Sequence, residues 1–539
     1  MFKLLLRVSL ALLVGSSLPF SQAAGGPLGS ALSPPPDPVG KPSTEAQELL
    51  GKALFWDEQL SSTRTVACGT CHIPSVGGSD PRLGLHPGID GEFNTLDDVI
   101  GSPGVIQSAA SGRYSANEDF GLEAMVTGRK APTMINAAFA PELFWDGRAT
   151  DSFSDPVTGD LVLASGAALE SQAVGPLLSS VEMAHLGRDW GDVVLRLGES
   201  EPLALASNLD PELTDFVEGQ DYTSLFLAAF GTGEMTPVRI AMAIASYERT
   251  LISIQAPVDG PPGSLTPQEA RGRQLFNTKG RCNRCHSGSL FTDFGFKNTG
   301  VTPIAEDLGR GGITGRPMDN GAFKTPDLRN IELRAPYFHN GSAQSLEEVI
   351  DFYDRGGDFH VNQAPAVAPI GFTLLEKADL VAFLKRPMTD PEVAAETGLF
   401  ARPTLYSESA RQPSLYGFGT AASSGLVPRA IAVEPPLLGN SSMTVAVDQA
   451  PPVGNAFLLI DLDQGFYQVL GADVLLALGP QLLVVPLGLM QATVQGDGYT
   501  SASLQVPSSL SNVGIEVFLQ WFVFSDGLSA SEGIEVVLF

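Results

Sequence analysis

The sequence has few cysteines, few basic side chains and no long apolar run in its interior. Its 539 residues include four Cys and six His, with 32 Lys and Arg against 60 Asp and Glu, so the formal net charge is -28. A surface this acidic repels nucleic acid and anionic membranes, and neither is an expected partner. Beyond the N-terminal region, no segment reaches the ~18 consecutive apolar residues of a membrane-spanning helix. The length suits about three or four domains.

All four cysteines fall into two copies of one pattern, in which two thiols stand three positions apart and a histidine follows at once. The copies are Cys68, Cys71 and His72, and Cys282, Cys285 and His286. Such a triplet can bond both vinyl groups of a haem and present an imidazole to its iron. Two disulfides or a zinc site are the alternatives. Because both copies are complete and no cysteine is left over, we expect two covalently bound haem c groups.

The N-terminus has the features of an export signal. A basic start precedes an apolar run at residues 4–18, and small residues follow at 21–23. This pattern predicts a secretory signal peptide over residues 1–23, with an uncleaved anchor as the alternative. We therefore expect a periplasmic or secreted protein with no transmembrane segment after cleavage. Residues 24–43 are rich in Pro and Gly and are expected to form a linker.

A helix leads into each haem motif. Thr44 and Thr266 each begin a capping box that is followed by apolar residues at helical spacing. The order of helix, turn and haem motif therefore occurs twice, which indicates an internal duplication. We expect a mainly α fold with two c-type-cytochrome-like haem domains, at residues 44–260 and 261–390. The first contains a Gly, Ser and Asp-rich insertion at 74–127, which we expect to be irregular.

The spacing of apolar residues changes from helical to β-type near the C-terminus. Beyond residue 430, six or more short β-type runs are separated by Gly, Pro, Asp and Ser. They predict an all-β sandwich-like domain over residues 431–539, with a linker at 391–430. The domain has no Cys, no His and no obvious acid pair, so we assign it no chemistry.

Six ordered motifs carry a family resemblance. They are Pro-Thr-Met-Ile-Asn at 132–136, Phe-Trp-Asp-Gly-Arg-Ala at 144–149, Glu-Ser-Gln-Ala at 170–173, Val-Glu-Met at 181–183, Lys-Thr-Pro-Asp-Leu-Arg-Asn at 324–330 and Ala-Pro-Tyr-Phe-His-Asn-Gly at 335–341. Together they resemble the bacterial di-haem cytochrome c peroxidase and MauG family over residues 44–390. The resemblance implies an oxidoreductase that reacts with hydrogen peroxide at an N-terminal peroxidatic haem and has a C-terminal electron-transfer haem. It makes His72 and His286 the proximal iron ligands.

Glu182 and Gln172 match a glutamate and a glutamine that stand over the open face of the N-terminal haem in that family. Peroxide cleavage needs a base that moves a proton from one oxygen to the other. A carboxylate in a weakly polar pocket, with a raised pKa, can take this proton and return it. We therefore predict that Glu182 is the general acid/base and that Gln172 is its hydrogen-bonding neighbour. Without the resemblance, Glu182 would be assigned to a solvent-facing helix surface.

Trp145 and Tyr353 complete the expected redox site. Trp145 resembles the family's tryptophan between the haems, which relays electrons; without that context it would be a core residue. Tyr353 shares the buried face of a predicted helix, at the place where the family's peroxidases have an axial methionine and MauG-type enzymes a tyrosine. The resemblance therefore implies that Tyr353 is the axial ligand of the second iron, where a tyrosinate oxygen would favour oxidised iron. A core tyrosine is the alternative, and Met318 and Met388 are rival ligands.

Two further features of the family concern a calcium site and a loop histidine. Asn136, with backbone carbonyls near Arg334 and Pro336, matches an inter-haem calcium site, although an arginine replaces the usual small residue. Many peroxidases of the family close the resting N-terminal haem with a loop histidine. The segment before Pro132 has none, and His86 in the insertion is the only candidate that we consider. We expect an open resting haem.

Three functions follow from these observations. A MauG-like enzyme would use peroxide to oxidise residues of a protein substrate. A cytochrome c peroxidase would reduce peroxide to water with electrons from a small redox protein. A non-enzymatic electron-transfer cytochrome has no use for Glu182 and Gln172. Tyr353, the missing loop histidine and the added β-domain favour the first function, and the net charge favours a basic donor or a neutral substrate.

Overall fold

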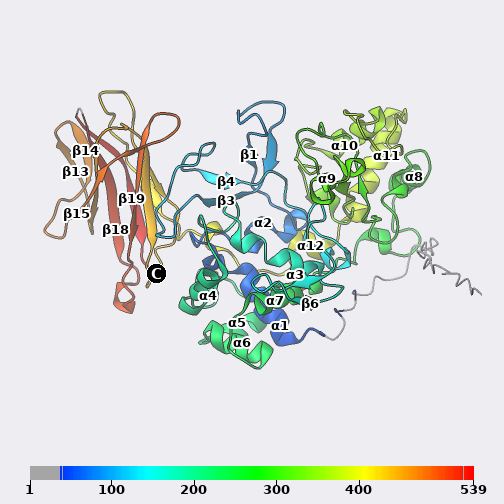
Figure 1. Ribbon diagram of the computed structural model, residues 1–539, viewed down its shortest axis with the longest axis horizontal. Helices are drawn as coiled ribbons and strands as arrows, with labels where there is room; N and C mark the ends of the chain where they lie inside the picture. The colour runs from blue at the N-terminus through cyan, green and yellow to red at the C-terminus, as the bar shows by residue number, and fades with distance from the viewer. Residues whose placement is uncertain (1–34, 36, 39–40, 526) are drawn as a thin grey trace, which may run out of the picture.

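The structure is a computed structural model that describes residues 35, 37–38, 41–525 and 527–539. The expected signal peptide at 1–23 and most of the expected linker at 24–43 lie outside the described residues. Three bodies lie in a row (Figure 1): the β-domain at one end, a first helical unit in the centre and a second helical unit at the other end. In the described part of the chain, no helix is long and apolar enough to cross a membrane.

The first helical unit surrounds the first haem motif. Its helices are α1 (Glu45–Trp56), α2 (Cys68–Cys71), α3 (Ala168–Ala173), α4 (Trp190–Glu199), α5 (Pro211–Val217), α6 (Tyr222–Phe230) and α7 (Pro237–Thr250), with a short pair of strands, β5 (Phe153–Ser154) and β6 (Leu161–Leu163). Thr44 caps α1 by accepting a hydrogen bond from the backbone N–H of Gln47. Apolar faces of α1, α6 and α7 meet in one core, which places α2 and its haem motif at the edge of that core.

The second helical unit surrounds the second motif. Its helices are α8 (Pro267–Asn277), α9 (Arg310–Thr314), α10 (Leu346–Arg355) and α11 (Leu374–Leu384), with the strand pair β7 (Phe296–Lys297) and β8 (Phe323–Lys324). Thr266 and Glu269 form the predicted capping box of α8. Ser345 caps α10, and Gly356, in a left-handed conformation, ends it.

The two units repeat each other's backbone geometry, as the duplicated sequence pattern predicts. A Cβ atom on Gly51 of α1 would lie 1.9 Å from a carbonyl oxygen of α7, and one on Gly272 of α8 would lie 1.9 Å from a carbonyl oxygen of α11. Both helix pairs therefore approach at a distance that only glycine permits. Asn136 and Asn330 also have matching left-handed φ angles of 61° and 60°. The repeat thus extends well beyond the haem motifs.

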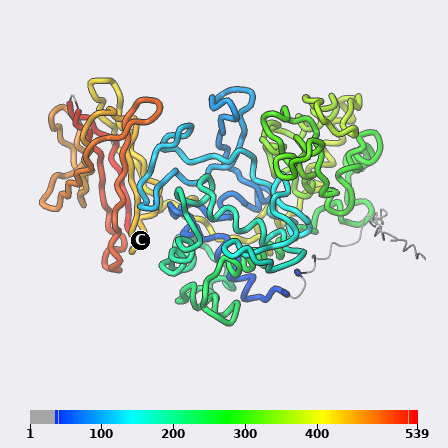
Figure 2. The backbone as a smooth tube through the Cα atoms, in the orientation of Figure 1, coloured from blue at the N-terminus to red at the C-terminus, as the bar shows by residue number. Residues whose placement is uncertain are grey.

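The insertion at 74–127 is more ordered than expected. It contains the antiparallel pairs β1 (Gly84–His86) with β2 (Val99–Gly101), and β3 (Pro103–Ile106) with β4 (Ala124–Val126). Strands of three or four residues are too short to produce a clear alternation in sequence. Figure 2 shows that this segment lies over the first unit, with one part reaching the β-domain.

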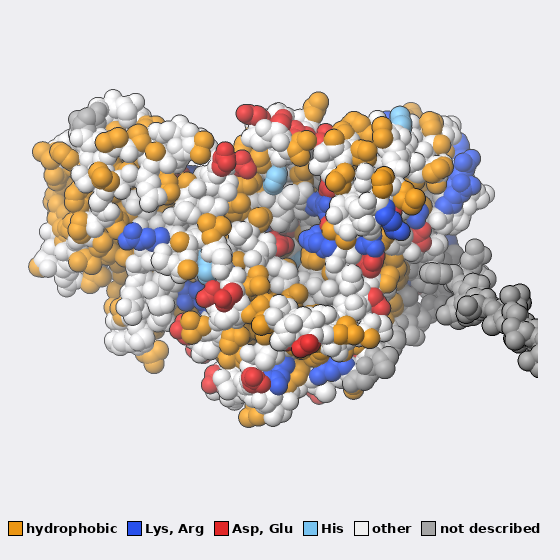
Figure 3. All heavy atoms as spheres, viewed as in Figure 1, with side chains coloured by type: hydrophobic (Ala, Val, Ile, Leu, Met, Phe, Trp, Pro, Cys, Tyr) orange, Lys and Arg blue, Asp and Glu red, His pale blue; other side chains and the backbone are white. Residues whose placement is uncertain are grey.

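The C-terminal domain is the expected antiparallel sandwich. One sheet has the order β10-β11-β17-β16 and the other β15-β12-β18-β19-β9, and β13 and β14 form a separate hairpin. The strands are β9 (Ser414–Tyr416), β10 (Arg429–Ala432), β11 (Met443–Ala450), β12 (Asn455–Asp461), β13 (Gln464–Val469), β14 (Ala472–Leu476), β15 (Leu483–Leu489), β16 (Gln491–Ala492), β17 (Gly498–Leu504), β18 (Glu516–Phe524) and β19 (Leu528–Val537). Val445, Leu458 and Trp521, from both sheets, pack in one core. Figure 3 shows many hydrophobic side chains over the outer end of this domain, whereas Lys and Arg gather over the second unit and its junction with the first.

Residues 391–430 are built into the fold and do not form a free linker. They include α12 (Pro391–Ala395) and the strand β9. Val393 and Phe400 are buried in the core of the first unit. The carboxylate of Glu58 accepts backbone hydrogen bonds from Tyr406 and Ser407. This segment therefore ties the β-domain to the first unit.

Candidate haem and peroxide sites

The histidines of both haem motifs have the orientation that an iron ligand needs. His72 Nδ1 lies 3.1 Å from the carbonyl oxygen of Gly78, and His286 Nδ1 lies 2.9 Å from that of Phe291. Because a carbonyl oxygen only accepts hydrogen bonds, each Nδ1 carries the proton. Each Nε2 therefore keeps its lone pair for a metal.

The four cysteines are free, so the structure does not pair them as disulfides. Burial raises the pKa of the Cys68 and Cys282 thiols to about 12. Each thiol pair stands beside an oriented imidazole, and the residues fit a covalently attached haem at both motifs.

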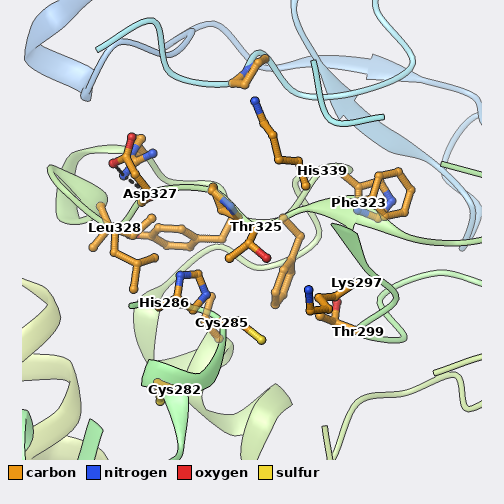
Figure 4. Close-up of a pocket in the computed structure, with 18 of the residues that line it drawn as sticks. Cys282, Cys285, His286, Lys297, Thr299, Phe323, Thr325, Asp327, Leu328 and His339 are labelled. Atoms are coloured by element: carbon orange, nitrogen blue, oxygen red, sulfur yellow. Dashed lines mark hydrogen bonds and ion pairs between the residues drawn. The ribbon is translucent and has the colours of Figure 1, made fainter. Parts of the chain in front are cut away.

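One cavity contains the expected ligands of the second haem. Cys282, Cys285 and His286 line it from the attachment turn, and Tyr353 lines it from α10. Figure 4 shows Cys285 and His286 on this turn, with Thr325 on the segment above them. Burial raises the pKa of Tyr353 above its usual range. The fit to haem therefore includes a candidate oxygen ligand.

The rival methionines lie elsewhere. The side chain of Met318 is 75% exposed, whereas Met388 is fully buried in the core of the second unit. Neither residue lines the cavity. The structure thus brings Tyr353, and neither methionine, to the cavity that His286 lines.

Glu182 lies close to the first haem motif. Burial raises the pKa of its carboxyl, while a hydrogen bond from Ser179 and the charge of Arg148 lower it. Burial is the main cause that raises the pKa values of the Cys68 and Cys71 thiols, and the negative charge of Glu182 is one of the smaller causes. The carboxyl therefore lies within electrostatic reach of the haem-attachment residues.

Gln172 lies in the last turn of α3 and is partly buried. In the described part of the chain, no hydrogen bond joins its side chain to Glu182, so the expected pairing stays a prediction. Sequence reasoning missed Arg148, whose guanidinium lies 3.5 Å from the centre of the Phe144 ring and whose charge acts on Glu182. Arg148 could have been found from the sequence, because it belongs to the motif at 144–149.

Trp145 lies at the junction of the two units. Its Nε1–H donates to the carbonyl oxygen of Lys130 at 2.8 Å, and its own carbonyl accepts from the backbone N–H of Lys324 at 2.8 Å. Its ring centroid is 6.4 Å from that of His339, and it lines the cavity of the second haem motif. The indole thus contacts residues of both units.

Two lysines flank this tryptophan, Lys130 buried and Lys324 partly buried, and neither was singled out from the sequence. Burial lowers the pKa of both Lys130 and Lys324 to about 8. Each stands two residues before a proline in equivalent motifs of the duplication, Pro132 and Pro326. The two lysines could have been found from the sequence, because they occupy equivalent positions in the two repeats.

The expected calcium ligands do not suit a cation. Asn136 Oδ1 already accepts a hydrogen bond from the backbone N–H of Ser253, and its buried Nδ2 is a donor without a partner. The buried guanidinium of Arg334 donates to the backbone carbonyl and the side chain of Asp327. A positive side chain at this site repels a metal ion, so the contacts around Asn136, Arg334 and Pro336 do not support calcium.

His86 belongs to the insertion, where it ends β1 and packs against Phe120 with ring centroids 5.9 Å apart. Its Nδ1 accepts from the backbone N–H of Gly88. These contacts hold its ring within the insertion, and the open first haem stays a prediction.

The comparisons with known proteins agree with this geometry. The family model for di-haem cytochrome c peroxidase matches residues 45–261. The methylamine utilization protein MauG of Methylophilus methylotrophus is 31% identical over 358 residues, which cover 65% of this chain and 84% of that protein. The chain belongs to the di-haem cytochrome c peroxidase and MauG family.

Other relatives in the family carry the peroxidase name. The cytochrome c551 peroxidase of Nitrosomonas europaea is 29% identical and matches 66% of this chain and 84% of its own length. A solved structure of a MauG-like protein associated with microbial copper homeostasis has a TM-score of 0.50 and 27% identity, and covers 70% of this chain and 99% of its own. The chain is therefore a di-haem oxidoreductase, and the names of its relatives divide between MauG and peroxidase.

Proposed function

We propose that this protein is an exported di-haem enzyme that uses hydrogen peroxide to oxidise residues of a protein substrate, in the MauG mode. The observation that carries the proposal is Tyr353, which lines the same cavity as His286. A phenolate oxygen favours oxidised iron, whereas the rival methionine sulfurs lie away from this cavity. With haem bound, the second site would therefore favour oxidised iron until a substrate supplies electrons.

The two haem c groups, held by His72 and His286, supply the iron chemistry when they are bound. Glu182 takes a proton from the near oxygen of peroxide and returns it to the far one. Its burial keeps the carboxyl partly protonated nearer to neutral pH than an exposed glutamate, which suits a group that must both accept and donate. Arg148 limits this rise in pKa and keeps the base available.

Trp145 is the proposed path for electrons between the sites. Its indole contacts residues of both units and is fixed by the hydrogen bond to Lys130. We infer a periplasmic or secreted location from the predicted signal peptide, and a basic or neutral partner from the net charge of -28.

The test is a titration of the all-ferric, haem-loaded protein with one equivalent of peroxide and no reductant, followed by optical and EPR spectra. The proposal expects an immediate reaction in which the signals of both haems change together. A protein that reacts only after one haem has been reduced would instead be a reductively activated cytochrome c peroxidase. A protein that does not react in either state would be an electron-transfer cytochrome.

A further inference from the structure

We propose that Gly104 is a positioning residue for Glu182 and that the insertion at 74–127 transmits support from the β-domain to this carboxylate. The inference rests on the proposed role of Glu182 and gives the insertion and the β-domain a part in peroxide chemistry.

The first contact is between backbones. A Cβ atom on Gly104 would lie 1.9 Å from the carbonyl oxygen of Val181 and 2.9 Å from Cα of Glu182. Any side chain at this position must therefore displace the peptide that carries Glu182. The requirement is for space, because Gly104 is not among the residues with positive φ.

The loop that carries Glu182 is held from two sides. On one side, the first unit contributes Ser62, whose N–H donates to the carbonyl oxygen of Met183 at 2.8 Å and whose Oγ accepts from the N–H of His185 at 2.7 Å. On the other side, the carbonyl oxygen of Ser108 in the insertion accepts from the N–H of Leu186 at 2.9 Å. The insertion thus contacts this loop before and after the carboxylate.

The same part of the insertion is anchored in the β-domain. Ser108 pairs with Tyr114 in an antiparallel bridge. The backbone N–H of Tyr114 donates to Ser501 Oγ at 3.0 Å, and its hydroxyl donates to Glu434 Oε1 at 3.0 Å. Tyr114 is 4% exposed and Glu434 is 2% exposed.

Apolar packing adds to these bonds. Ile106, Tyr114 and Leu122 of the insertion form one buried cluster with Ala446 and Tyr499 of the β-domain. A continuous set of contacts therefore runs from Glu434 through Tyr114 and Ser108 to the loop of Glu182. A misplacement of about 1 Å in a catalytic group can cost about 100-fold in rate, so this support has consequences for catalysis.

The experiment compares Gly104→Ala with Gly128→Ala as a matched control in the full-length, haem-loaded protein. A Cβ atom on Gly128 would meet only His86 Nε2, at an ordinary 3.9 Å. The expected result is a roughly 100-fold slower reaction of the ferric protein with peroxide for Gly104→Ala, both haems bound, and an unchanged rate for Gly128→Ala. A wild-type rate for Gly104→Ala would overturn the inference.

The double variant Glu182→Gln/Gly104→Ala separates positioning from general damage. If Gly104 acts through Glu182, the double variant reacts no more slowly than Glu182→Gln alone. A further loss in the double variant would show that Gly104 acts on something else. A wild-type rate for Glu182→Gln itself would refute the proposed function and the inference together, whereas a slow Glu182→Gln beside a normal Gly104→Ala refutes only the inference.

Tyr114→Phe tests the contact between the insertion and the β-domain. It also tests the support of the Glu182 loop if Gly104→Ala does not fold. It removes the hydroxyl that bonds Glu434 and keeps the ring. We expect a slower peroxide reaction in the wild-type background and no further loss in the Glu182→Gln background. An unchanged rate, or an additive loss, would contradict the transmission of support from the β-domain.

Discussion

Trp145 and His339 meet in a T-shaped arrangement at the junction of the two haem units, with ring centroids 6.4 Å apart and an interplanar angle of 66°. They occupy the same place in the two repeats, because each follows a phenylalanine with positive φ, Phe144 at 61° and Phe338 at 69°. The duplication therefore brings two aromatic rings together at its own interface. The residue at this position between the units is Trp145 in the first repeat and the buried His339 in the second.

Trp145→Phe should separate the two haems functionally. Phenylalanine is much harder to oxidise, and the lost indole N–H leaves the Lys130 carbonyl unpaired at a cost of about 1–3 kcal/mol. We expect the first haem to react with peroxide while the second fails to respond. Stopped-flow spectra at wavelengths specific to each haem measure this. Trp190→Phe, which changes a buried tryptophan of α4, is the control, and a normal response of the second haem in Trp145→Phe would refute the relay.

Tyr353→Phe should remove the oxygen that we propose would bind the iron of the second haem. We expect a changed ferric EPR spectrum for the second haem only. Tyr353→Met should raise the reduction potential of that haem, because a thioether favours reduced iron. Tyr337→Phe changes another tyrosine of the same cavity and should leave both properties unaltered. If Tyr353→Phe keeps the wild-type spectrum, Tyr353 is a core residue and the MauG mode loses its main support.

Arg334 should make the protein indifferent to calcium. Neither a calcium chelator nor added calcium should shift the melting temperature, because a ligand stabilises a fold only when it binds the native state. Arg334→Ala should be strongly destabilising, by about 3–5 kcal/mol, because it leaves the buried carboxylate of Asp327 without its ion-pair partner. Thermal melts with and without calcium check both statements. A rise in melting temperature with calcium would contradict this prediction and support a calcium site.

Stability should depend on pH through Glu434. Burial raises its pKa from 4.5 to about 8. Between these values the folded protein holds a proton that the unfolded chain has released, so this contribution is complete at low pH and is lost as the pH rises toward 8. Glu434→Gln mimics the protonated acid and should flatten this part of the pH profile in denaturant unfolding. Identical profiles for the two proteins would show that Glu434 does not titrate in this range.

Local signals predicted much of this fold. The capping residues Thr44, Thr266 and Ser345 start helices where expected, since a cap depends on a few adjacent residues. The strands of the β-domain also followed from local alternation. The spacing of the Cys and His residues in both motifs likewise led to the prediction of haem attachment.

Long-range contacts could not be predicted from local patterns. The partner of Tyr114 lies more than 300 residues away, at Glu434, and the strands around Tyr114 are too short to show periodicity. The space requirement at Gly104 depends on a loop almost 80 residues further along the chain.

The most direct test of the account is the rate at which the ferric, haem-loaded Glu182→Gln variant reacts with peroxide, beside wild type and the exposed control Glu201→Gln. Loss of an acid/base group costs about 100- to 10,000-fold. The account predicts a loss of this size for Glu182→Gln, with both haems attached, and a wild-type rate for Glu201→Gln. An unchanged rate for Glu182→Gln would contradict the account, because no other carboxylate has been assigned to proton transfer at the first haem.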